Sequence, residues 1–174
     1  NSKIIDRNMA GGFLCMTVKI QKGELHEIEI HGYAHEGQGV GRIDGLTVFV
    51  EGALKGEKVI AKIDKVSKTY AIAHTKKIIE SSVDRIQPKC PHADKCGGCM
   101  LQHLSYEAQI EFKTQKVKDS LERIGKINTT VLDTIGMKEP WCYRNKAQYP
   151  VGEDQGQAVL GFYEKRTHKI VPSD

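Results

Sequence analysis

The stretch GVGRIDGLTVFVEGAL, residues 39–54, decides the fold of the first half of the chain. Apolar residues alternate with polar ones around Val48 and Val50, and glycines interrupt the pattern on both sides. The flanking stretches 25–35 and 55–79 show the same alternation. A period of two, with turn residues about every ten positions, predicts short strands that form a small antiparallel β-barrel or sandwich of about sixty residues.

Glycines cluster at Gly37, Gly39, Gly41 and Gly45. Glycine tolerates positive φ and leaves room for another backbone, so we expect tight turns or close strand contacts there. The run GQGVG, residues 37–41, lacks the spacing of the G-x-G-x-x-G phosphate loop, and strand-like sequence follows where that motif needs a helix. It therefore does not indicate a nucleotide site.

Composition and charge are those of a globular protein. Of 174 residues, 39% are hydrophobic, which suffices for a packed core, and the net charge of +4 is too small by itself to indicate a nucleic-acid partner. No stretch reaches the roughly 18 apolar residues that span a bilayer, and residues 1–15 lack the apolar segment of a signal peptide. We therefore expect a cytoplasmic protein without a membrane partner, and we interpret residues 1–23 as a leader or N-terminal extension.

The strand pattern ends at Ser81–Pro88, and a helix follows. The residues Tyr106–Ile124 are predicted to be helical, with Ser105 as the N-cap and Gly125 just past the end. The apolar residues of this helix form one stripe, which we expect to pack in a core. They are Ile110, Val117, Leu121 and Ile124.

Strand-like sequence resumes after the helix. It covers residues 129–137 and continues through residues 142–171. The chain stops at Asp174 with no helix to close this second sheet, so we interpret the end as lying inside a domain.

Three of the five cysteines, Cys90, Cys96 and Cys99, lie within ten residues. In a reducing compartment this C-x5-C-x2-C spacing favours metal binding over disulfides. We expect Gly97 and Gly98 to adopt positive φ and to let backbone amides point at sulfur. Tetrahedral zinc and a cubane iron–sulfur cluster both suit these thiolates, and each needs a fourth ligand. The nearby candidates are His103, His92 and Cys142.

Several motifs together resemble a known family. They are C-P-x4-C-G-G-C from Cys90, LQHLSYEAQIEFK at 101–113, the barrel sequences at 37–42 and 48–59, YRNKAQYPV at 143–151 and LGFYEKRTHKIV at 160–171. Over residues 24–174 the chain resembles the N-terminal part of the RNA 5-methyluridine (uracil-5-)-methyltransferase family.

This resemblance implies a mainly β fold with some α structure. A TRAM domain, which is a small OB-like antiparallel β-barrel, would cover residues 24–86, and a cluster-binding cysteine loop would cover residues 87–104. One long amphipathic helix at 105–125 and an incomplete α+β central domain at 126–174 would follow.

The family binds a [4Fe-4S] cluster through four cysteines. The resemblance assigns three of these roles to Cys90, Cys96 and Cys99 and places the fourth cysteine beyond Asp174, so we expect the cluster to be labile, absent or replaced by zinc here. Cys142 does not match a family ligand. S-adenosylmethionine and the catalytic residues belong to a C-terminal domain in the family, so we assign no catalytic residue and expect the chain to be inactive alone.

The resemblance also implies structured RNA as the partner, with rRNA preferred to tRNA as the substrate and a looped uridine flipped out for reaction. An OB-like barrel offers basic residues to phosphates and aromatic residues to bases. The candidates are Arg42, Lys58, Lys62, Lys65, Lys68 and Tyr70 in the barrel, and Arg144 and Lys146 in the central domain. For any single lysine, a solvated strand edge is an equally good explanation.

Two further interpretations stay open at this point. The chain could be a free-standing RNA-binding module with no activity and a Cys3His zinc site, built from Cys90, Cys96, Cys99 and His103. An exposed apolar stripe on the helix 105–125 would in addition allow the chain to self-associate.

Overall fold

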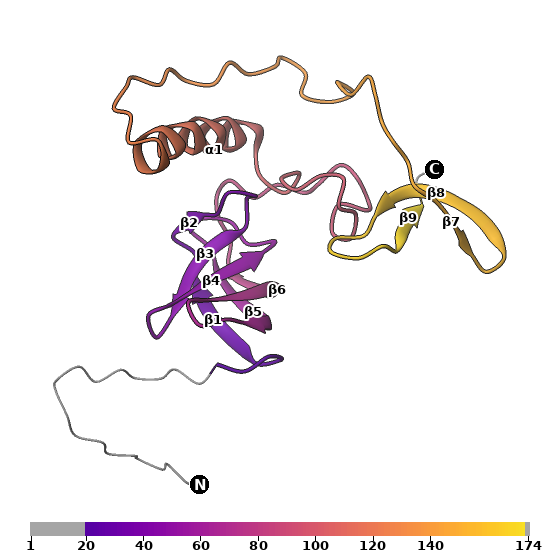
Figure 1. Ribbon diagram of the computed structural model, residues 1–174, viewed down its shortest axis with the longest axis horizontal. Coiled ribbons are helices and arrows are strands. Elements are labelled where there is room, and N and C mark those ends of the chain that lie inside the picture. Colours follow the sequence, from indigo (N-terminus) through magenta and orange to yellow (C-terminus); the bar gives the residue numbers. More distant parts are fainter. Residues whose placement is uncertain (1–19, 173–174) are drawn as a thin grey trace, which may run out of the picture.

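The computed structural model describes residues 20–172, so the extension expected at residues 1–23 lies almost wholly outside the described part (Figure 1). Six strands form one curled sheet in the order β1-β5-β6-β4-β3-β2. They are β1 (Leu25–Glu29), β2 (Gly32–Tyr33), β3 (Gly39–Ile43), β4 (Leu46–Glu51), β5 (Lys58–Val66) and β6 (Tyr70–Glu80). Because β1 also contacts β3, the sheet curls into a barrel.

Neighbouring strands of the barrel are antiparallel except for β4 and β6. These two strands run parallel, with Val50 opposite Ala73. The chain passes from β4 to β5, on the far side of β6, before it returns in β6, and this connection gives β4 and β6 the same direction. The predicted antiparallel β-barrel is confirmed, with this one parallel pair as the exception.

The barrel encloses the hydrophobic core. Its strands alternate buried with half-buried or exposed positions, as the period of two predicts. The buried apolar residues are Ile20, Ile28, Ile30, Val48, Val50, Ala53, Val59, Ala61, Ile63, Ala71 and Ala73. Removal of these side chains from water stabilises the barrel.

The clustered glycines allow both a tight turn and close contacts between strands, as expected. Gly45, with φ of +88°, makes the turn between β3 and β4. At Gly39 a Cβ atom would lie 2.8 Å from Ile30 Cγ2 and 2.9 Å from the carbonyl oxygen of Ala53, so a side chain would clash with these neighbouring residues of the barrel.

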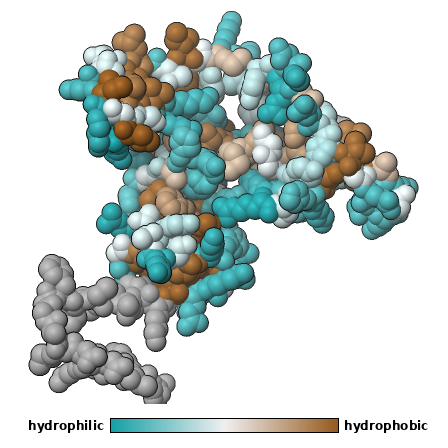
Figure 2. All heavy atoms as spheres, viewed as in Figure 1, coloured by the Kyte–Doolittle hydropathy of each residue, from teal (hydrophilic) through white to brown (hydrophobic). Residues whose placement is uncertain are grey.

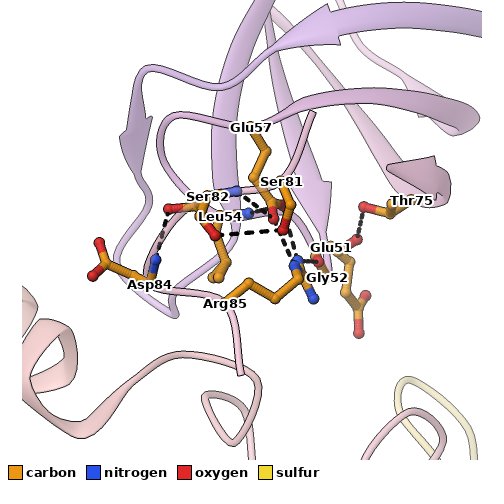
Figure 3. A network of polar contacts seen from close by, with 9 residues as sticks. All are labelled: Glu51, Gly52, Leu54, Glu57, Thr75, Ser81, Ser82, Asp84 and Arg85. Carbon is orange, nitrogen blue, oxygen red and sulfur yellow. Dashed lines mark hydrogen bonds and ion pairs between the residues drawn. The ribbon is translucent and has the colours of Figure 1, made fainter. Parts of the chain in front are cut away.

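A buried ion pair ties the barrel to the segment that follows it (Figure 3). The side chain of Glu57 is fully buried, and Arg85 Nε and Nη2 donate to its two oxygens at 2.5 and 2.9 Å. The backbone amides of Leu54 and Ser82 also donate to this carboxylate, and Arg85 Nη2 reaches the carbonyl of Gly52 at 2.7 Å. The segment at residues 81–88 is therefore fastened to the barrel rather than a free linker.

The same segment pairs with the residues just before the helix. Arg85 forms an antiparallel bridge with Leu104, which is fully buried. The amide of Ile86 donates to the carbonyl of His103 at 3.0 Å, and the amide of Ser105 donates to the carbonyl of Asp84 at 2.8 Å. Both ends of the cysteine loop, residues 87–104, are thereby held together at the barrel.

The predicted helix is present as α1 (Tyr106–Asp119), followed by a π-helical turn, η1 (Ser120–Ile124). The Ser105 hydroxyl accepts from the amide of Ala108 at 3.3 Å, and Gly125 is the C-cap. The predicted bounds, N-cap and C-terminal glycine are therefore confirmed.

The predicted burial of the helical stripe is wrong for Val117 and Ile124, whereas Ile110 and Leu121 are half-buried. Val117 is 48% exposed and Ile124 is 82% exposed, and an open cleft of about 1110 Å³ lies between the helix and the barrel. Across it, the rings of Tyr33 and Phe112 meet edge to face with centroids 5.3 Å apart. Figure 2 shows hydrophobic residues gathered on the surface over the helix.

The segment after the helix contains no strand between residues 126 and 150, so the strand predicted at 129–137 is wrong. This segment instead contacts the helix: Thr134 Oγ1 lies 2.8 Å from Thr114 Oγ1, and the amide of Met137 donates to the Tyr106 hydroxyl at 2.7 Å. The later strand prediction is confirmed in part by a three-stranded antiparallel sheet. Its strands are β7 (Val151–Asp154), β8 (Gln157–Tyr163) and β9 (Ile170–Pro172).

Within residues 20–172, no helix is long and apolar enough to cross a membrane.

Candidate nucleic-acid interface and cysteine loop

The cysteine loop packs against the sheet formed by β7, β8 and β9. Cys96 forms an antiparallel bridge with Glu164, and the amide of Gly97 donates to the carbonyl of Tyr163 at 2.9 Å. The amide of Gly98 donates to Cys96 Sγ at 3.3 Å, which is the amide-to-sulfur contact that the sequence predicts. Residues 66 and 68 positions apart in the sequence thus share one hydrogen-bonded unit.

The two glycines between Cys96 and Cys99 do not adopt positive φ, so the prediction for Gly97 and Gly98 is wrong. Close approach requires them instead. A Cβ atom on Gly97 would lie 2.9 Å from the carbonyl oxygen of Tyr163, and one on Gly98 would lie 3.3 Å from the ring of Phe162. A larger residue at either position would push the loop away from β8.

The three loop cysteines do not converge on one point. Cys90 and Cys96 are half-buried and Cys99 is exposed. Among residues 20–172 there is no group of three His, Cys, Asp or Glu side chains placed to hold a metal ion. In this conformation the loop supplies thiols and one amide donor, but it does not form a metal site.

His103, the proposed zinc ligand, lies apart from the cysteines at the barrel junction. Its Nε2 atom is buried without a hydrogen-bond partner. Burial, together with the positive charges of Arg85 and Lys165, lowers the pKa of His103 to about 4, so the ring is neutral at pH 7. Its backbone carbonyl receives the Ile86 amide, which is a structural role.

The other two candidate ligands also lie outside any metal-binding group. The backbone carbonyl of His92 accepts from the amides of Lys95 and Cys96, so this residue helps to shape the loop through its main chain. Cys142 is exposed, with φ of +55°, in the segment before β7.

The outer face of the barrel brings together several of the predicted RNA-binding residues. Thr47 and Phe49 lie on the face of β4 opposite the buried Val48 and Val50, and in the register Arg42 and Tyr70 flank Thr47. The rings of Phe49 and Tyr70 meet edge to face, with centroids 5.7 Å apart. We define Arg42, Phe49, Lys62, Lys65, Tyr70 and Ile72 as the outer barrel face.

Two of the predicted lysines lie on the same side of the barrel as these rings. Lys65 lies opposite Ile72, and Lys62 lies opposite His74, so both lysines share the face of β6 that carries Tyr70. Both are exposed. Aromatic rings and cations on one face suit single-stranded RNA, because bases stack on the rings and phosphates neutralise the cations.

The remaining barrel candidates lie at the margins. Lys58 Nζ pairs with Glu27 Oε1 at 2.7 Å, and this carboxylate raises the pKa of Lys58. Arg42 also borders a cleft of about 350 Å³ that contains Glu27 and Glu29. Lys68 is exposed in the turn between β5 and β6.

Arg144 and Lys146 are exposed in the segment before β7. The Arg144 guanidinium lies over the ring of Phe162, 5.6 Å from its centroid, and the Tyr149 ring lies 4.9 Å from the same centroid. Because Phe162 also faces Gly98, Arg144 lies beside the cysteine loop.

Phe49 and Glu57 were not predicted from the sequence. Phe49 could have been found, because it occupies the outward position between two core valines. Glu57 offers no such signal, because a glutamate after a turn glycine is typical of an exposed strand end.

The outcome of sequence and structure comparisons agrees with this geometry. The TRAM domain family matches residues 19–76. An RNA methyltransferase of Caldanaerobacter subterraneus subsp. tengcongensis is 56% identical over 156 residues, which cover 90% of this chain and 34% of the relative. One of Halalkalibacterium halodurans is 48% identical, over 89% of this chain and 34% of the relative.

A solved structure is also similar. The tRNA (uracil-54, C5)-methyltransferase of Pyrococcus abyssi, in complex with S-adenosyl-L-homocysteine, matches with a TM-score of 0.55 and 27% identity, over 85% of this chain and 31% of that one. The chain thus spans about a third of the length of the relatives that it matches. Over that length, the chain is similar to RNA methyltransferases, and its residues 19–76 match the TRAM domain family.

Proposed function

We propose that this chain is the RNA-handling part of an S-adenosylmethionine-dependent RNA (uracil-5-)-methyltransferase, and that its outer barrel face binds unpaired or looped RNA. The observation that supports the proposal is the Phe49–Tyr70 edge-to-face pair on the outside of the barrel, on the same face as Lys62 and Lys65. Aromatic rings and cations on a barrel face are the elements that OB-type folds use for single strands.

The activity of the whole protein is proposed from its relatives. Formation of 5-methyluridine needs a uridine that has left its stack, so looped rRNA, and tRNA as the alternative, are the substrates proposed. S-adenosylmethionine and the reacting groups would belong to a domain outside residues 1–174, and the protein would work in the cytoplasm. None of the described residues is assigned a catalytic role.

An RNA-binding measurement tests the role of the barrel. Fluorescence anisotropy with a labelled single-stranded oligouridylate should show that Phe49→Ala and Tyr70→Ala each weaken binding about tenfold. Lys138→Ala, an exposed lysine in the segment after the helix, should leave the dissociation constant unchanged. If Phe49→Ala and Tyr70→Ala bind the oligouridylate as tightly as the control Lys138→Ala does, the proposed RNA-binding face is refuted.

Full-length protein distinguishes the two RNA classes. Methyl transfer from labelled S-adenosylmethionine to rRNA transcripts should exceed transfer to tRNA transcripts. A reversed preference would assign the protein to tRNA.

We also propose that Cys90, Cys96 and Cys99 bind a [4Fe-4S] cluster, with a fourth cysteine following Asp174. The C-x5-C-x2-C spacing and the Gly98 amide directed at Cys96 Sγ support this proposal. The cluster would supply structural cross-linking of the loop.

Anaerobic purification followed by iron, sulfide and zinc analysis tests the cluster. Brown protein with iron and sulfide would support it, and Cys96→Ser should abolish the colour. Colourless protein with one zinc, lost in His103→Ala, would favour the Cys3His alternative instead.

A further inference from the structure

The turn between β8 and β9 is basic and aromatic. Residues 164–169 contain Lys165, Arg166, His168 and Lys169 against the single acid Glu164. The rings of Tyr163 and His168 stand edge to face, with centroids 5.5 Å apart and planes at 79°. Tyr163 is 44% exposed, and His168 is also exposed. We call residues 163–169 the hairpin tip.

The hairpin tip is held in place by hydrogen bonds of its backbone amides and of the Lys165 side chain. The amide of Glu164 donates to the carbonyl of Lys169 at 2.8 Å, and the amide of Lys165 donates to the carbonyl of Lys95 in the cysteine loop at 3.0 Å. Lys165 Nζ donates to the carbonyl of Ala93 at 3.1 Å. Aromatic residues on an ordered turn lose less entropy when a ligand binds than they would on a mobile loop.

An ion pair joins the hairpin tip to the barrel. Arg166 Nη2 lies 2.9 Å from Glu51 Oε2, and the Glu51 side chain is 16% exposed. Glu51 lies two residues after Phe49 on the same side of β4, which is about 7 Å along the strand. The hairpin tip therefore meets the barrel at the edge of the outer barrel face, and in Figure 1 the turn between β8 and β9 points toward the barrel.

We propose that the hairpin tip is a second RNA-contact site, in which an unpaired base stacks on Tyr163 and His168 while the phosphates meet Lys169. The Glu51–Arg166 pair aligns this site with the outer barrel face, so that one single strand crosses both. The inference rests on the proposed function, because the barrel face must bind RNA for the two sites to act together. Stacking on rings that are already positioned costs little ordering, and each base adds affinity.

The test uses the complete chain with labelled oligouridylates of about 6 and about 14 nucleotides, which lie near the two ends of the range of site sizes of one OB fold. Tyr163→Ala should weaken binding of the longer probe about tenfold and binding of the shorter probe less than about twofold, because the barrel alone accommodates the shorter one. Tyr70→Ala should weaken both. Tyr163→Phe separates stacking from hydrogen bonding, because it keeps the ring and loses the hydroxyl.

The ion pair is tested by charge exchange. Glu51→Lys and Arg166→Glu should each weaken the longer probe, and the double variant should recover most of the lost affinity, because it restores an opposite-charge pair. Thermal unfolding of each variant checks that the barrel is intact. Failure of the double variant to recover affinity would overturn the alignment role.

Three outcomes separate this inference from the proposed function. If Tyr70→Ala weakens binding and Tyr163→Ala does not affect the longer probe, the second site is refuted and the barrel face stands. If an abasic ribose-phosphate oligomer of equal length binds as well as the oligouridylate, charge alone acts and stacking is refuted. If the unaltered chain binds neither probe, the proposed function itself fails.

Discussion

The barrel and the helix α1 both carry apolar residues at a regular period, but only the barrel buries them. Val48 and Val50 are fully buried, whereas Val117 is 48% exposed and Ile124 is 82% exposed. The strands of the barrel cover one another, so each apolar face finds a partner within about sixty residues. The helix meets the barrel across an open cleft, with Tyr33 and Phe112 in contact. Periodicity thus determines which element forms, whereas burial depends on what lies beside it.

Breaking the ion pair that fastens the barrel to the helical region should have the largest effect. Glu57→Ala leaves the Arg85 guanidinium and two backbone amides without their acceptor, so we expect the free energy of unfolding to fall by about 3–5 kcal/mol. Urea denaturation followed by circular dichroism measures it. Glu27→Ala, which removes the exposed pair with Lys58, should cost less than about 1 kcal/mol. Equal costs would contradict the structure.

A matched pair of truncations compares the two regions directly. Ile63→Ala in the barrel core should lower the free energy of unfolding by about 2–5 kcal/mol, because it leaves a cavity. Val117→Ala on the exposed side of the helix should change it by less than about 0.5 kcal/mol. A large cost at Val117 would show that the stripe is covered in solution, and light scattering would then test self-association as the cause.

Acid should weaken the junction between the two regions before it affects the barrel core. Burial and neighbouring cations lower the pKa of His103 from 6.5 to about 4, so below pH 6.5 the unfolded chain binds a proton that the folded chain does not. Stability is therefore complete above about pH 6.5 and falls as the pH decreases toward 4. Unfolding measured from about pH 7 to about pH 4.5 should show this decline, and His103→Leu should remove it.

Glu57 extends the loss of folding stability on acidification to lower pH. Burial alone would raise the pKa of Glu57, but the hydrogen bonds from Arg85, Leu54 and Ser82 outweigh burial and hold this pKa below its ordinary value of 4.5. The stabilisation by Glu57 is present above that value and is lost as the pH falls through the lower folded pKa. A stability that rises on acidification would contradict both assignments.

A smaller effect than at Glu57 or Ile63 is expected at the start of the helix. Ser105→Ala removes the acceptor for the Ala108 amide and should cost about 1 kcal/mol. Ser105→Asp should retain most of the stability, because a carboxylate also caps. If Ser105→Ala costs nothing, the first turn of α1 is held by tertiary contacts alone.

Local rules predicted the elements well where the chain itself supplies the partner. The strands around Val48 and Val59, the glycine turn at Gly45 and the cap at Ser105 all follow from short-range steric and hydrogen-bonding preferences. These local rules failed at residues 129–137, where strand-like sequence predicted a strand. No strand pairs with that segment, and it lies along α1 through Thr134 instead.

The candidate site was predicted by residue type but not by arrangement. Arg42, Lys62, Lys65 and Tyr70 were named from the sequence, and register determines that they share one face with Phe49. The role of Glu57 depends on its contact with Arg85, which lies 28 residues away in the sequence. Arg166 contacts Glu51 across 115 residues, and Gly97 contacts Tyr163 across 66 residues. Such contacts leave no periodic signal.

The sequence by itself determined the barrel and the helix with both ends, because alternation and capping are local properties of neighbouring residues. The tertiary structure alone decided the parallel β4–β6 pair, the exposure of the helical stripe, and the joining of the hairpin tip to the barrel. These features depend on which distant surfaces meet, and free energies of burial and pairing across the whole chain select those contacts.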